Sequence, residues 1–230
     1  MKIHRFFVED ELLDRGQIRI FSGELLNQLK NVLRFKKDEN IILFNNTGFD
    51  FLVSIQEYER DSILFFIIEK YQNITTPQRE TYLFVSIIKK DNFEWIVEKA
   101  TELGVSHIIP IVSQRTEKKD INRDRLKKII IESSEQSGRG TLPVLYDISL
   151  IESTLENYRH IRSIVWEPLS TKFTKEEVDS CIGSYIGPEG GWTMEEIDLF
   201  RKHNVPVRSL GPQVLRTETA VISTISMLVF

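Results

Sequence analysis

The sequence predicts an α/β fold in which a small β domain precedes a larger domain with a mostly parallel sheet. Before residue 70, short apolar segments are separated by turn-forming residues, and within residues 49–55 apolar and polar residues alternate with a period of two, as in half-buried strands. A polar stretch containing Pro77 follows, and beyond it short apolar runs alternate with segments of helical periodicity. That alternation is typical of a parallel sheet covered by helices on both faces. We therefore expect domains at residues 1–72 and 73–230.

In the first domain we expect consecutive strands joined by tight turns. Strands are predicted at residues 41–44, 49–55 and 63–68, separated by turn-forming residues at 45–48 and 60–61. This order indicates an antiparallel meander or a small barrel. Between Glu24 and Arg34, apolar residues recur at helical spacing, so a short amphipathic helix should lie on that barrel.

The second domain is predicted from alternating strands and helices. Strands are expected at residues 81–88, 107–112, 163–167, 182–186 and 205–210. A helix should cover residues 93–103 and end at Gly104, and Asn122 can begin the next one. Capping-box spacing marks three further helix starts, at Ser149…Glu152, Thr174…Glu177 and Thr193…Glu196.

Composition limits the classes of function. The 230 residues carry a formal net charge of −4 and are 41% hydrophobic, as in a folded globular protein. No apolar run approaches the roughly 20 residues that span a bilayer, and the single cysteine cannot form an internal disulfide. We therefore expect a cytoplasmic protein without a membrane partner. Residues 115–139 hold eight lysines and arginines, which form either a basic face or an ordinary solvated helix.

Two glycine-proline loops are the strongest candidates for a ligand site. The first covers residues 185–193 and the second residues 209–220, and each runs from the end of a predicted strand to the start of a predicted helix. Ligands of open parallel sheets bind beyond the carboxyl ends of the strands, and glycines let the backbone approach them closely. Strand-to-helix turns without a ligand are the alternative for either loop.

Other motifs, and the absence of some, limit the kinds of reaction and ligand that the sequence predicts. Arg139 stands between two glycines, where it is placed to bind phosphate, although residues 132–140 are equally consistent with helix capping and solvation. The fingerprints of dinucleotide loops, phosphate-binding loops and nucleophile elbows are absent from the sequence. The four histidines lack partners at ligand spacing, so we expect no metal site.

Several segments occur together and in the same order in one known family. They are KATELGV at 99–105, EQSGR at 135–139, IGPEGG at 186–191, LGP at 210–212 and VLRTETA at 214–220, with RFF at 5–7 and VLR at 32–34 in the first domain. Through these motifs, nearly the whole chain resembles the ribosomal RNA small subunit methyltransferase E family. That family belongs to the SPOUT class of S-adenosylmethionine-dependent enzymes.

The resemblance implies a fold, a cofactor and partners. The larger domain would be a SPOUT-type α/β domain with a trefoil knot, and the first a PUA-like RNA-binding β-barrel. S-adenosyl-L-methionine would be the cofactor, and the enzyme would act as a homodimer on ribosomal RNA of the small subunit. The implied reaction is methylation of the N3 position of a specific uridine in 16S ribosomal RNA.

The resemblance also implies roles for individual residues. Cofactor-binding residues would be Ile186, Gly187, Pro188, Glu189, Gly190, Gly191, Leu210, Gly211, Val214, Leu215 and Arg216. Arg5, Arg34, Arg115 and Arg139 would bind RNA. Uracil N3 must lose its proton, and an arginine beside the flanking carbonyls would stabilise the resulting charge. Arg216 and Arg139 are candidates for that role, while Glu218 or Glu189 would accept the proton or orient the arginine.

The chain departs from the family pattern at three places. Gln28 stands where a histidine is usual, Gln213 replaces a common arginine, and residues 115–135 are shorter and lack a customary tryptophan. A non-catalytic RNA-binding or ribosome assembly factor on the same fold is the alternative function. The apolar segment 220–230 favours burial between subunits, with burial in its own domain as the alternative.

Overall fold

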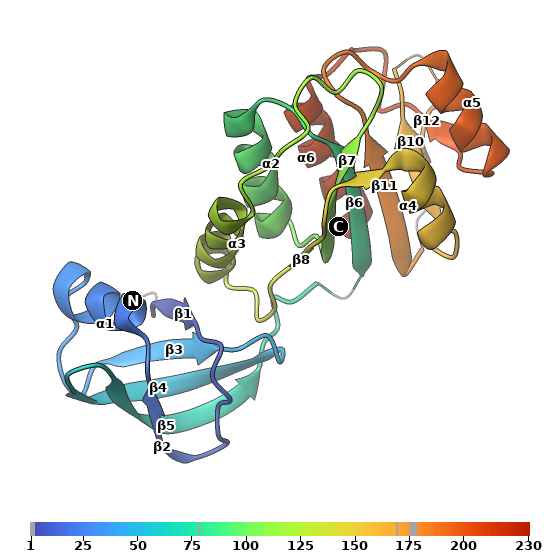
Figure 1. Ribbon diagram of the computed structural model, residues 1–230. Helices are drawn as coiled ribbons and strands as arrows, with labels where there is room; N and C mark the ends of the chain where they lie inside the picture. The colour runs from blue at the N-terminus through green and yellow to red at the C-terminus, as the bar shows by residue number, and fades with distance from the viewer. Residues whose placement is uncertain (1–2, 78, 169, 175–178) are drawn as a thin grey trace. The chain divides into compact units, whose positions relative to one another are not determined.

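The computed structural model describes residues 3–77, 79–168, 170–174 and 179–230. The chain forms two compact units, each with its own core (Figure 1). The N-terminal unit comprises the residues up to Thr76 together with Ser134–Leu142. The C-terminal unit comprises Pro77–Ser133 and Pro143–Phe230. The short segment after residue 133 is thus part of the N-terminal unit, although it lies far from that unit in the sequence.

The N-terminal unit is built on a five-stranded sheet. Its strands are β1 (Arg5–Phe7), β2 (Gly16–Ile20), β3 (Asn40–Phe44), β4 (Phe49–Tyr58) and β5 (Ile63–Gln72), in the order β1-β3-β4-β5-β2. β3, β4 and β5 form the predicted antiparallel meander. β1 pairs in parallel with β3, and β2 is antiparallel to β5. The inward side chains of these strands, with Leu25 and Leu29, form a closed apolar core.

The predicted helix between residues 24 and 34 is divided into two short pieces. Helix α1 (Gly23–Asn27) begins at Ser22, whose hydroxyl accepts a hydrogen bond from the Leu25 amide. A π-helical turn, η1 (Gln28–Val32), continues it. The chain then leaves through Arg34, which has a left-handed backbone with a φ of 59°. Of the apolar residues at helical spacing, Leu25 and Leu29 lie in the core as predicted, whereas Val32 and Leu33 are 65% and 40% exposed. The pattern could not show the change of helical period at η1.

The C-terminal unit contains a parallel sheet, which confirms the predicted class. Its strands are β6 (Glu80–Ser86), β7 (His107–Val112), β8 (Val144–Leu145), β9 (Ser149–Leu150), β10 (Ser163–Trp166), β11 (Cys181–Ile186) and β12 (Val207–Arg208). The order is β12-β10-β11-β6-β7-β8, with β9 also pairing with β7. All of these pairs are parallel, so their carboxyl ends meet at one edge.

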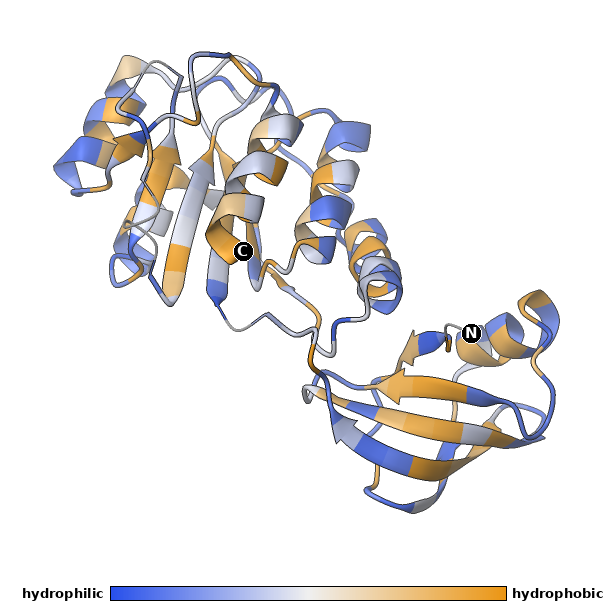
Figure 2. Ribbon diagram, turned by 180° about the vertical axis from the view of Figure 1, so that it is seen from behind, coloured by the Kyte–Doolittle hydropathy of each residue, from blue (hydrophilic) through white to orange (hydrophobic). Residues whose placement is uncertain are grey.

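Helices cover both faces of this sheet. They are α2 (Lys90–Glu102), α3 (Arg123–Ser137), α4 (Ile151–Asn157), α5 (Met194–Lys202) and α6 (Thr217–Val229). Apolar side chains of α4 and α5 pack with Phe84, Tyr185 and Phe200 in one cluster. On the other face, α6 packs against α2 and against β6 and β11 (Figure 2). No helix in the described part of the chain is long and apolar enough to cross a membrane.

The structure confirms some of the predicted helix N-termini and contradicts another. The capping box of Thr193 and Glu196 is confirmed, with both reciprocal hydrogen bonds present at the start of α5. Asn122 caps α3, because its side chain accepts a bond from the Arg125 amide. The capping box predicted at Ser149 is wrong: Ser149 lies in β9, and its hydroxyl donates to the Asp147 carbonyl. The one predicted at Thr174…Glu177 extends outside the described residues.

Candidate functional site

The first glycine loop leaves β11 at the carboxyl edge of the parallel sheet. The Gly191 amide closes a turn by donating to the Pro188 carbonyl at 2.9 Å, and Gly191 has a positive φ of 69°. The indole of Trp192 folds back over Gly187, where an added Cβ would lie 3.1 Å from the ring. Trp192 is held there because its Nε1 donates to the Trp166 carbonyl at 3.1 Å. These contacts hold the conformation of the loop, and within it Glu189 and Gly190 are exposed.

The second loop is held by its own serine and joined to the first. The Ser209 hydroxyl accepts a hydrogen bond from the Gly211 amide at 3.1 Å and donates one to the Gly211 carbonyl at 2.8 Å. At the start of α6, the Thr217 hydroxyl donates to the Gly187 carbonyl at 3.2 Å. The tertiary structure thus brings together the two loops that the sequence singled out.

Arg115 connects a third segment to this edge. It lies in the loop after β7, and its Nη1 donates to the carbonyl of Gly190 at 2.6 Å and to that of Trp192 at 3.3 Å. The neighbouring Gln114 amide donates to the Glu196 carboxylate at 2.8 Å. The arginine expected to bind RNA phosphate therefore supports the backbone of the first glycine loop.

The loops leave both apolar and charged groups accessible. The Val214 side chain is 79% exposed, and Leu210 and Leu215 are half-buried beside it in sequence. Glu189 and Gly190 are exposed, and Glu218 is half-buried in the first turn of α6. Such a surface suits a ligand with an apolar ring and positively charged groups, because backbone groups, aliphatic side chains and carboxylates are all available.

Arg216 stands at the N-cap position of α6, directly after the second loop. Its side chain is exposed and makes no hydrogen bond or ion pair within the described residues. A guanidinium that is not committed to a protein partner is available to a ligand or to a substrate base. Arg216 and Glu218 both belong to the C-terminal unit, as do the two glycine loops.

Arg139 and Arg5 occupy a different environment, inside the N-terminal unit. Arg139 is only 4% exposed, its Nε donates to the Thr141 carbonyl at 2.6 Å, and burial lowers its pKa to about 10. Arg5 forms an ion pair with Asp50 and also donates to the Arg139 carbonyl at 3.3 Å. Asn73 donates to Asp50 and to the Gly138 carbonyl. These contacts are those of an internal polar network that holds residues 138–141 rather than those of an exposed phosphate ligand.

Arg34 is exposed on the turn that follows η1. It is the one of the four arginines expected to bind RNA that is both exposed and without a hydrogen bond in the described part of the chain. Its left-handed backbone directs the chain out of the helical turn and into β3.

Glu167, which was not among the predicted site residues, follows β10 at the same carboxyl edge as the loops. Burial raises the pKa of the Glu167 carboxyl, and the charge of Arg115 opposes part of that rise. The available signal was an acidic residue at the end of an apolar predicted strand, at the edge where ligands of parallel sheets bind. Among the described residues, no group of three or more His, Cys, Asp or Glu could hold a metal ion.

Comparison with known proteins identifies the family. Residues 75–229 match the model of the RNA methyltransferase domain, and residues 22–68 match that of the RNA methyltransferase PUA domain. The chain is 30% identical to ribosomal RNA small subunit methyltransferase E of Rickettsia conorii, covering 98% of this chain and 95% of the relative. It is 31% identical to the protein of the same name from Buchnera aphidicola subsp. Schizaphis graminum, covering 99% and 96%.

Solved structures agree with these relatives. A putative methyltransferase from Legionella pneumophila, in complex with SAM, has a TM-score of 0.88 and 27% identity, with 99% of this chain and 97% of that chain covered. Ribosomal RNA small subunit methyltransferase E from Neisseria gonorrhoeae, bound to S-adenosyl methionine, has a TM-score of 0.88 and 26% identity, covering 98% and 96%. The chain therefore belongs to the ribosomal RNA small subunit methyltransferase E family.

Proposed function

We propose that this protein methylates the N3 position of one uridine in small-subunit ribosomal RNA, with S-adenosylmethionine as methyl donor. The observation that carries the proposal is the junction of the two glycine loops at the carboxyl edge, made by Thr217 and Gly187. Relatives over nearly the full length of the chain are named as methyltransferases of small-subunit ribosomal RNA, and two structural neighbours contain the cofactor.

The residues at this edge fit S-adenosylmethionine. The backbone of residues 186–191 and 210–216 supplies amide and carbonyl groups for an adenine, and Val214, Leu210 and Leu215 supply an apolar surface for its ring. Glu189 and Glu218 can face the positive sulfonium and amino groups. When bound, the cofactor supplies an electrophilic methyl group, so the protein needs to position the reactants rather than to provide a nucleophile of its own.

The chain's own residues account for the remaining chemistry. Uracil N3 must lose its proton, and the carboxylates of Glu218, Glu189 and Glu167 are the candidate acceptors at this edge. The charge left on the base spreads to its carbonyl oxygens, where a free guanidinium stabilises it. We assign that role to Arg216, because its side chain is exposed beside the loops, whereas Arg139 is buried in the N-terminal unit.

The proposal extends to partners and assembly. The N-terminal unit binds ribosomal RNA, with Arg34 as its exposed phosphate ligand. The protein acts as a cytoplasmic homodimer and contains the trefoil knot implied by its family. One stripe of α6, including Val221 and Leu228, is buried within its own unit, so the dimer contact would use the other stripe and the 79% exposed Phe230.

Methyl transfer to isolated ribosomal components tests the proposal. Small subunits and their naked 16S RNA, both from a strain lacking the gene, are incubated with the protein and isotope-labelled S-adenosylmethionine. Mass spectrometry of nuclease digests should find one labelled N3-methyluridine. The Gly190→Val variant is the control, because its branched side chain crowds Arg115 and the proposed cofactor surface. RNA binding without any heat on titration with S-adenosylmethionine would instead establish a non-catalytic factor.

A further inference from the structure

A cationic hollow lies at the amino-terminal edge of the parallel sheet, the edge opposite to the glycine loops. Its walls come from the residues that precede β10 and β12, including Arg159, Arg162 and His203, and from Ser163 at the start of β10. The volume of the hollow is about 670 Å³. Because the strands of this sheet are all parallel, the hollow and the methyl-transfer loops occupy opposite strand ends.

The charge of this hollow differs from that of the whole chain. Two arginines and two histidines line it, and no Asp or Glu among the described residues does so. The guanidinium groups of Arg159 and Arg162 are exposed and make no hydrogen bond or ion pair within the described residues. In a chain whose formal net charge is −4, unneutralised arginines gathered around one cavity mark a site for an anion.

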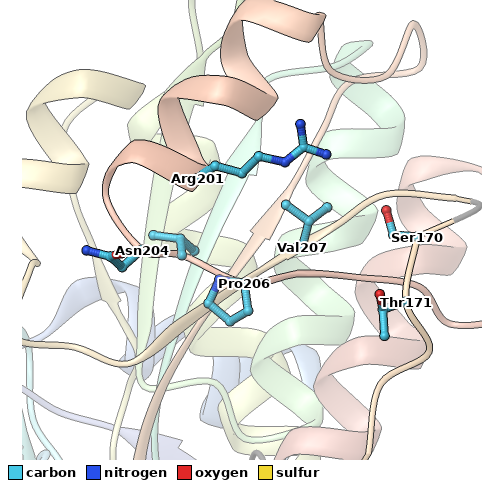
Figure 3. A pocket seen from close by; sticks show the side chains of 7 residues that line it. Ser170, Thr171, Arg201, Asn204, Pro206 and Val207 are labelled. Carbon is cyan, nitrogen blue, oxygen red and sulfur yellow. The ribbon is translucent and has the colours of Figure 1, made fainter.

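A second hollow of about 590 Å³ adjoins the first. The two share the lining residues Asn204, Val205 and Pro206, so they form one groove. In the second hollow, Arg201 extends over Val207 on the side of Ser170 (Figure 3). Arg201 donates to the exposed Asp198 at 3.0 Å, so the positive charge of this end of the groove is offset, and Arg159 and Arg162 supply the uncompensated charge.

We propose that this groove binds the phosphate backbone of the substrate RNA, with Arg159 and Arg162 at the strand ends opposite to the glycine loops. The inference rests on the proposed function, because it assigns an additional contact to the same substrate. Guanidinium groups bind phosphate oxygens by paired hydrogen bonds, and Ser170 and Asn204 add neutral polar groups. Two connected hollows suit consecutive phosphates of a strand better than a single small anion.

A double substitution of the full-length protein tests the groove. Arg159→Gln with Arg162→Gln removes two exposed charges without breaking an ion pair, so the melting temperature and the affinity for S-adenosylmethionine should stay unchanged. Affinity for 16S RNA should fall, and the slope of log K against log salt should decrease in magnitude by about 1.5, since each phosphate contact contributes about 0.7–0.9. Lys99→Gln is the matched control, because Glu98 and Glu102 already neutralise that lysine.

Each outcome decides the inference. An affinity and a salt slope equal to those of the wild type would overturn it, and so would an equal loss in the Lys99→Gln control. If the wild-type protein methylates 16S RNA but the double variant binds that RNA with wild-type affinity and salt slope, the groove is refuted and the proposed function stands. If the wild-type protein neither binds nor methylates 16S RNA, the proposed function fails and the groove fails with it.

Discussion

The Nη1 atom of Arg115 lies 2.6 Å from the carbonyl oxygen of Gly190, within the first glycine loop. The family resemblance implies that this arginine binds RNA. The structure shows that its guanidinium also reaches the Trp192 carbonyl and that an added Cβ on Gly190 would lie 3.3 Å from its side chain. Arg115 therefore supports the loop whose backbone is proposed to contact the cofactor.

Loss of this support should weaken cofactor binding. Arg115→Ala removes two hydrogen bonds from a charged donor, and a net loss of about 1.5 kcal/mol corresponds to a roughly tenfold rise in Kd. Isothermal titration with S-adenosylmethionine measures it, and Lys119→Ala is the control for removing an exposed charge from the same segment. If Arg115→Ala binds the cofactor with a normal Kd but binds RNA more weakly, Arg115 is a phosphate ligand and not a support of the loop.

Substitutions of Arg216 and Arg34 should affect different quantities, turnover in the first case and RNA affinity in the second. Arg216→Ala should lower turnover at saturating substrate by roughly 10²- to 10³-fold with little change in RNA affinity, because its charge acts on the developing negative charge of the base. Arg34→Ala should weaken RNA binding and reduce the salt slope by about one unit, with saturated turnover near normal. A separate titration must show that Arg216→Ala still binds S-adenosylmethionine. Equal losses of RNA affinity with normal turnover in both variants would make Arg216 a binding residue.

Arg5 should contribute to stability rather than to RNA binding. Arg5→Met leaves the Asp50 carboxylate unpaired at 4% side-chain exposure, which should cost about 3 kcal/mol or more and lower the Tm by several degrees. The double variant with Asp50→Leu should recover much of that loss, because no charge then remains buried. Thermal unfolding followed by circular dichroism measures both. A normal Tm with weakened RNA binding would identify Arg5 as the RNA ligand predicted from the sequence.

Glu167 should destabilise the folded protein when it is ionised. Burial raises the pKa of its carboxyl, so the charged form is less favourable in the folded chain than in the unfolded chain. Glu167→Gln should therefore raise the Tm at pH 8. The gain should shrink as the pH falls through the raised folded-state pKa and disappear below about 4.3, where the unfolded-state carboxyl is protonated too. Glu117→Gln, at an exposed position, is the control. A gain in Tm that does not depend on pH would show that the cause is not the charge.

The parallel sheet and the positions of the glycine loops follow from local signals in the sequence. Apolar runs such as β6 and β11, and the capping box at Thr193 and Glu196, depend on residues only a few positions apart. Gly191 has the positive φ for which glycine is favoured. Since parallel strands end at a common edge, the sequence alone also determined that both loops lie at that edge.

The partners of the charged residues were decided by the tertiary structure. Arg5 pairs with Asp50, 45 residues away, and Arg115 bonds to Gly190, 75 residues away. No sequence periodicity connects such distant positions. The arginine guanidinium can donate hydrogen bonds equally well to a carboxylate, a backbone carbonyl or an RNA phosphate, so the residue type does not reveal its partner. Packing alone decides which of these partners lies within reach, and so the sequence predicted the ligand loops but not which arginines remain free to act.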